Sequence, residues 1–172
     1  MNEHAELRPQ LSYGTHKGMV EQVITDLGRR GEVDGRALRL PGIVARPRQP
    51  NGLRSAFMSD LLRAFAEGAA YECPVSPEAT AWWMSARCCV NNLIHAAEIE
   101  GELRGQRVWQ LPVLHLPIAQ VVDALAASYG EERRELISYA ADEPLEALFG
   151  RLPPLKTPLA RAAGFNHDGN AT

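Results

Sequence analysis

Apolar residues recur at helical spacing in four stretches of the chain. In residues 12–30 they lie three and four positions apart, which places them on one stripe of a helix. That stripe contains Val20, Val23, Ile24 and Leu27. Similar patterns predict helices over residues 55–67, 87–99 and 117–129. Val90, Leu93, Ile94 and Ala97 are expected to face inward from the third of these helices.

Two apolar runs predict buried strands. Residues 36–47 follow a glycine-rich turn directly behind the first helix, as a parallel strand would. Pro41 and Gly42 should end this strand or make it bulge, because proline is poorly tolerated inside a central strand. Residues 107–111 predict a second strand, and the proline-containing stretch 73–86 is expected to be irregular.

Composition narrows the class of protein. The 172 residues carry a net charge of -3, and the basic residues are scattered, so we expect no nucleic-acid partner. No stretch has the ~20 apolar residues of a membrane span, so we expect no membrane partner. Three cysteines without a C-x-x-C pair predict reduced thiols and a cytoplasmic location. The histidines are dispersed, so no metal site is expected.

The string SYGTHKGMVE at residues 12–21 carries candidate chemistry. Tyr13 and Lys17 are four residues apart, so on a helix they lie on the same face. A free tyrosine is a poor acid or base at neutral pH, and a lysine cation close by stabilises its phenolate. A phenol placed in this way can exchange a proton with an alcohol. Alone, the four-residue pattern is weak evidence and more often marks an aromatic core residue beside an exposed lysine.

Several strings together resemble the extended short-chain dehydrogenase/reductases, the NAD-dependent epimerase/dehydratase family. These strings are SYGTHKGMVE, RGEVDGRALRLP, IVARP, NLIHA, RVWQLP and LKTPLARAAGF. They occur in the family's order over roughly the whole chain, and their finer match is to the D-erythronate dehydrogenase branch. The resemblance implies an α/β fold in which an incomplete Rossmann-like domain, made of the catalytic helix and late parallel strands, adjoins a small α/β substrate-binding domain.

The resemblance also implies domains and a cofactor. Residues 1–48 would be the Rossmann part and 49–172 the substrate-binding region, with residues 107–112 as a strand that can return to the Rossmann sheet. The turn-rich segment 46–52 supports a boundary there. The cofactor would be NAD, with NADP left open, because the part of the family sequence that selects between them is not in this chain.

The family resemblance assigns roles to individual residues. Tyr13 would be the general acid/base, and Lys17 would support it and hold the nicotinamide ribose. The backbone of Leu40, Pro41, Gly42 and Ile43 would lie against the nicotinamide. The branch usually has a hydroxyl-bearing residue where this chain has Gly42, which puts a side-chain contact there in doubt.

For the substrate, the expected class is a small sugar acid such as D-erythronate, oxidised at a secondary alcohol. Arg46 or Arg87 could hold its carboxylate through two parallel hydrogen bonds, or could form structural ion pairs. Asn51 and Ser55 could bind substrate hydroxyls, or could be turn and cap residues.

Part of the family pattern is missing from this chain. The G-x-x-G-x-x-G phosphate-binding turn is absent, and only twelve residues precede Tyr13. We therefore expect little activity from the chain alone, and a partner that is either a complementary N-terminal chain or a second copy bound through the Tyr-x-x-x-Lys helix. Two alternatives stay open: a nucleotide-sugar epimerase or dehydratase, and a non-catalytic remnant that serves as a dimerisation module.

Overall fold

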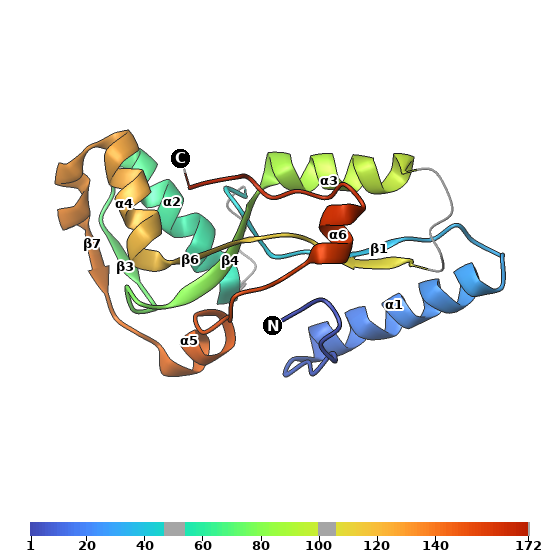
Figure 1. The fold of residues 1–172 in the computed structure, drawn as a ribbon. Helices are drawn as coiled ribbons and strands as arrows, with labels where there is room; N and C mark the ends of the chain where they lie inside the picture. The colour runs from blue at the N-terminus through green and yellow to red at the C-terminus, as the bar shows by residue number, and fades with distance from the viewer. Residues whose placement is uncertain (47–53, 100–105, 172) are drawn as a thin grey trace. The chain divides into compact units, whose positions relative to one another are not determined.

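The computed structural model describes residues 1–46, 54–99 and 106–171, without the side chain of Arg54 (Figure 1). The chain forms two compact units. The first unit comprises residues 1–40, 90–112 and 155–166, and the second comprises 41–89, 113–154 and 167–172. Each unit is assembled from segments that are distant in the sequence.

The first unit contains a two-stranded parallel sheet between helices. Strand β1 (Ala37–Arg39) pairs with β5 (Val108–Gln110), with Leu38 opposite Trp109. Helices α1 (Ser12–Arg29) and α3 (Ala86–Glu98) lie on opposite sides of this strand pair (Figure 1). The short helix α6 (Pro158–Ala162) packs near β5. Phe165 follows α6 and is fully buried, with its ring 5.4 Å from that of Trp109.

The second unit contains a three-stranded sheet in the order β2-β4-β6. Strand β2 (Gly42–Val44) runs parallel to the central strand β4 (Thr80–Ser85), and β6 (Leu114–Pro117) runs antiparallel to it. A separate parallel pair joins β3 (Tyr71–Cys73) to β7 (Ile137–Tyr139).

Helices α2 (Phe57–Glu67) and α4 (Ile118–Tyr129) pack against each other in the second unit (Figure 1). A 3-10 turn at Arg54–Ala56 precedes α2, and α5 (Glu143–Phe149) lies later in the chain. The core of this unit is formed by side chains that are almost completely removed from water. Its most buried members include Leu61, Phe65, Val75, Cys73 and Ile118.

The α/β class and the four main helices are confirmed, with bounds within about two residues, the usual precision of helix ends. The strand predicted across residues 36–47 does end before Pro41, and the chain resumes as β2 in a different sheet. The prediction that residues 73–86 are irregular is wrong, because β4 lies within that stretch and is the central strand of its sheet.

The predicted inward face of α3 is wrong, because Val90, Leu93 and Ile94 are each about half exposed. On α1, Val20 and Val23 of the apolar stripe are also exposed, to 54% and 57%. The buried residue of α1 is instead Glu21, an acidic side chain with a specific partner described below. Within the described residues, no helix is long and apolar enough to cross a membrane.

Candidate functional site

Tyr13 and Lys17 are brought together on one face of the first turns of α1. The Lys17 ammonium nitrogen lies 5.4 Å from the centre of the Tyr13 ring, within cation-π range. Both side chains are exposed, Tyr13 to 71%. The phenol and the ammonium can therefore reach the same ligand. The helix itself begins without a side-chain cap: Leu11 occupies the cap position.

Glu21 continues the same helical face one turn beyond Lys17 and fixes α1 to β1. Its two carboxylate oxygens accept hydrogen bonds of 2.8 and 2.7 Å from the Arg39 guanidinium. Glu21 is 8% exposed, and its hydrogen bonds and charge raise the pKa of Arg39. Two parallel hydrogen bonds between one guanidinium and one carboxylate strengthen the interaction and also fix the relative orientation of the two groups. The pair thus sets the rotation of the helix that carries Tyr13 and Lys17.

The predicted nicotinamide-contacting stretch is divided between the units. Leu40 ends the first unit and is 47% exposed, whereas Pro41, Gly42 and Ile43 belong to the second. A Cβ added to Gly42 would lie 2.6 Å from the Met58 sulfur and 2.9 Å from the Trp82 carbonyl oxygen. This packing accounts for a glycine at this position.

Among the predicted substrate-binding residues, Arg87 lines a pocket. Arg46 lies elsewhere: its backbone N–H donates to Ser59 Oγ, and its carbonyl accepts a 2.5 Å hydrogen bond from Arg63. Ser55 lies half-buried in the 3-10 turn before α2. Asn51 lies outside the described residues.

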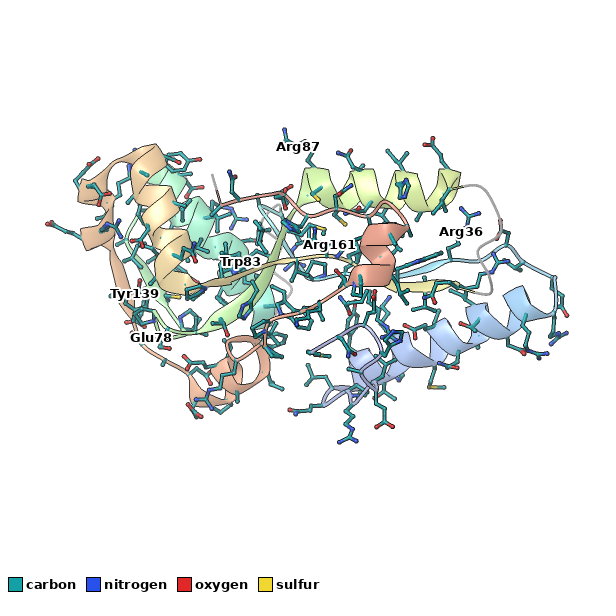
Figure 2. All side chains as sticks on the ribbon, viewed as in Figure 1. Arg36, Glu78, Trp83, Arg87, Tyr139 and Arg161 are labelled. Atoms are coloured by element: carbon teal, nitrogen blue, oxygen red, sulfur yellow. The ribbon has the colours of Figure 1, made fainter. Side chains whose placement is uncertain are left out.

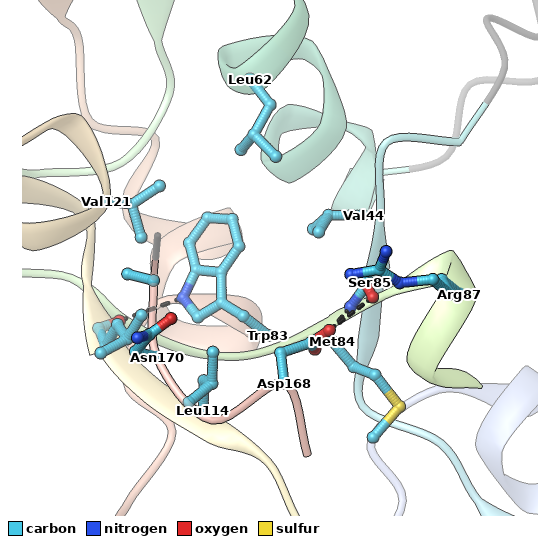
Figure 3. Close-up of a pocket in the computed structure, with 12 residues that line it drawn as sticks. Val44, Leu62, Trp83, Met84, Ser85, Arg87, Leu114, Val121, Asp168 and Asn170 are labelled. Carbon is cyan, nitrogen blue, oxygen red and sulfur yellow. Dashed lines mark hydrogen bonds between the residues drawn. The ribbon is translucent and has the colours of Figure 1, made fainter. Parts of the chain in front are cut away.

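The pocket lies wholly within the second unit and has a volume of about 260 Å³. Its apolar lining centres on Trp83, whose indole N–H donates to the Leu116 carbonyl at 3.2 Å. Ser85, Arg87 and Asp168 gather on one side of it (Figure 3). The remaining lining residues are Val44, Leu62, Met84, Leu114, Leu116, Val121, Asn170 and Ala171.

Asp168 attaches the C-terminal segment to the start of α3. Its carboxylate accepts a 2.9 Å hydrogen bond from the Ser85 N–H and a 2.5 Å bond from the Ser85 hydroxyl. Ser85 Oγ in turn accepts from the Cys88 N–H, as an N-cap does. The string Ser85-Ala-Arg-Cys88 could have shown this cap in the sequence. Nothing local to Asp168 points to its distant partner.

The buried thiols fit a structural role. Cys73 is fully buried, and burial raises its pKa, as it does that of Cys89. A raised pKa disfavours the nucleophilic thiolate. Among the described residues, no group of three His, Cys, Asp or Glu side chains converges as metal ligands do.

Two hydrogen-bond donors of the first unit, on Tyr13 and Lys17, would fit the ribose of a nicotinamide cofactor. The hydroxyl of Tyr13 and the ammonium of Lys17 can bond ribose hydroxyls, and both are exposed on one face. The sequence lacks the G-x-x-G-x-x-G pattern of a phosphate-binding turn, so these two residues would hold the ribose end of such a cofactor and not its phosphates.

Comparison with solved structures places the fold among oxidoreductases and epimerases. The chain is similar to the nucleoside-diphosphate-sugar epimerase of Agrobacterium tumefaciens, with a TM-score of 0.89 and 31% identity, covering 99% of this chain and 51% of that one. It also shares its fold with a GalE-like L-threonine dehydrogenase of Cupriavidus necator, at a TM-score of 0.84 and 20% identity over 99% of this chain and 55% of that one. The chain therefore shares its fold with about half of each of these two proteins.

Sequence comparison gives a finer relationship. The chain is 36% identical over 99% of its length to the D-erythronate dehydrogenase of Cupriavidus necator, covering 53% of that protein. It is equally identical over 94% of its length to the D-erythronate dehydrogenase of Haemophilus influenzae, covering 52% of it. The chain thus spans about half the length of the curated relatives it matches. Comparison with models of known protein families gives no match.

Proposed function

We propose that this chain provides the proton-transfer and substrate-binding parts of an NAD-dependent oxidoreductase that acts on a secondary alcohol of a small sugar acid such as D-erythronate. The observation that carries the proposal is the pairing of Tyr13 and Lys17 on one exposed helical face. The relationship to D-erythronate dehydrogenases supports the substrate class.

In the proposed reaction, Tyr13 moves the proton of the substrate hydroxyl. Its phenolate oxygen takes that proton as the carbon–hydrogen bond breaks, and the hydroxyl oxygen becomes the carbonyl oxygen of the product. When bound, a nicotinamide cofactor supplies a two-electron hydride acceptor. The Lys17 cation stabilises the phenolate and can donate a hydrogen bond to a ribose hydroxyl.

The test measures NADH formation from D-erythronate by the chain alone and by the chain supplied with the remaining half of the Cupriavidus necator relative. We expect little turnover from the chain alone and measurable turnover with the added half. Tyr13→Phe should then lower kcat by about 100-fold or more, because the proton acceptor is lost.

Tyr129→Phe is the matched control, because Tyr129 is also an exposed helical tyrosine with a cation, Arg133, 5.7 Å from its ring centre. It should retain full activity. A stable complex of the two halves that binds NAD but does not oxidise D-erythronate would contradict the proposed substrate. Equal kcat for the Tyr13→Phe and wild-type complexes would contradict the proposed role of Tyr13.

A further inference from the structure

The pocket of the second unit combines an apolar lining with a single cation. Trp83, Leu114 and Val121 form part of its lining, and Trp83 is only 4% exposed, so its ring is held rigidly by the core. Such a mixture, an apolar wall with a few placed polar groups, is typical of small-molecule sites. At about 260 Å³ the volume is slightly below the ~300–1,000 Å³ of pockets for drug-sized ligands. It therefore suits a short-chain ligand better than a nucleotide sugar.

Two charged side chains, those of Arg87 and Asp168, line this pocket. They differ in the hydrogen bonds and ion pairs that they already make. Both oxygens of the Asp168 carboxylate accept hydrogen bonds from Ser85, at the N-terminus of α3 where negative charge is stabilised. The Arg87 guanidinium has no ion-pair or hydrogen-bond partner within residues 1–46, 55–99 and 106–171. It projects outward from the first turn of α3 (Figure 2) and borders the pocket beside Ser85 (Figure 3).

We infer that this pocket binds a small hydroxy acid and that Arg87 holds its carboxylate. A guanidinium with free donors binds a carboxylate through two parallel hydrogen bonds, which fixes the orientation of the ligand. The carbon chain of the ligand lies against Trp83 and its apolar neighbours. This inference rests on the proposed function for the identity of the acid, and it selects Arg87 rather than Arg46 as the carboxylate-binding residue.

Asp168 is a positioning residue in this arrangement. Its two bonds to Ser85 hold residues 167–171 against the start of α3, and Asn170 and Ala171 of that segment line the pocket. Loss of Asp168 should therefore remove a wall of the pocket. Substitution of Arg87 should instead remove only the contact with the carboxylate of the ligand.

The experiment measures binding of D-erythronate and of erythritol, its neutral polyol analogue, to the purified chain by calorimetry. Arg87→Gln should weaken D-erythronate binding by about tenfold to a hundredfold, the usual range for a charge-assisted hydrogen-bonded contact, and leave erythritol binding unchanged. Arg161→Gln is the matched control, because Arg161 is an exposed arginine of the first unit outside the pocket and its loss changes the net charge equally. Asp168→Ala should weaken both ligands alike.

The inference is overturned if D-erythronate does not bind, if it binds no more tightly than erythritol, or if Arg87→Gln and Arg161→Gln weaken it equally. Tyr13→Phe separates this outcome from failure of the proposed function. The Tyr13→Phe variant should still bind D-erythronate. If binding depends on Arg87 while the complemented Tyr13→Phe enzyme turns over as fast as the wild type, the catalytic role of Tyr13 is rejected and the binding site is retained.

Discussion

At the scale of single residues, the sequence was informative where chemistry depends on local spacing. Tyr13 and Lys17 could be paired from sequence because four residues make slightly more than one helical turn. Asp168 could not be found in this way, because its partner Ser85 is 83 positions away and the contact depends on how the second unit folds. Arg46 and Arg87 looked equivalent in the sequence, and the fold alone places Arg87 at the pocket.

Gly42 gives a prediction at the same scale. Gly42→Ala should lower the free energy of unfolding by about 1–3 kcal/mol, because its new methyl group would overlap the buried Met58 side chain and the Trp82 backbone. Urea denaturation followed by tryptophan fluorescence measures this change.

Gly18→Ala is the control for Gly42→Ala, because the nearest atom to its new Cβ would be a Leu7 methyl carbon at an ordinary 3.5 Å. Gly18 lies inside α1, so alanine there should be neutral or stabilise the protein by up to about 1 kcal/mol. A Gly42→Ala protein as stable as the wild type would show that β2 accommodates a side chain.

At the scale of elements, helices were predictable and several strands were not. Each main helix carries a repeating apolar pattern over three or more turns, whereas β3, β6 and β7 span only three or four residues. The six residues of β4 follow Pro74 and Pro77 closely, and those prolines obscured a central strand. Its neighbours β2 and β6 come from distant parts of the chain, so no local pattern could reveal the pairing.

The Glu21–Arg39 ion pair gives a prediction for the packing of α1 on β1. Glu21→Ala should cost about 1–3 kcal/mol of stability, because it leaves a partly buried guanidinium without its carboxylate. The double variant E21M/R39M should be destabilised less than Glu21→Ala, because it leaves no unpaired charge. Thermal or urea unfolding of the variants measures both effects.

Asp26→Ala is the control for Glu21→Ala, because it tests whether loss of any acidic side chain on α1 lowers stability equally. Asp26 pairs with Arg29 at the surface of α1, where both side chains are about half exposed or more, so its loss should change stability by less than about 0.5 kcal/mol. Equal destabilisation by Glu21→Ala and Asp26→Ala would argue against a specific role for the buried pair.

At the scale of the whole molecule, the first unit exposes apolar side chains along one helix. Met19, Val20 and Val23 on α1 are each more than half exposed, and the described sheet of this unit has only two strands. The sequence predicted these apolar stripes correctly but not their exposure, because a helical stripe does not reveal whether its covering layer is present. Contiguous exposed apolar surface commonly marks a contact with another protein surface.

We therefore expect the 172-residue chain by itself to bind the dye ANS and to self-associate. The double variant V20K/V23E should reduce both effects without lowering stability, because the two side chains are exposed. Dye fluorescence and analytical ultracentrifugation measure the outcome. A wild-type chain that is monomeric and does not bind the dye would show that these helical faces need no partner.

The interleaving of the two units has a consequence for engineering. The chain passes between them at residues 40/41, 89/90, 112/113, 154/155 and 166/167, and one of these passages lies inside helix α3. The ligand pocket therefore cannot be transferred to another protein as one continuous segment without also transferring parts of the first unit. Exchanging it between relatives without the intervening parts of the first unit would require replacing three separate segments at once.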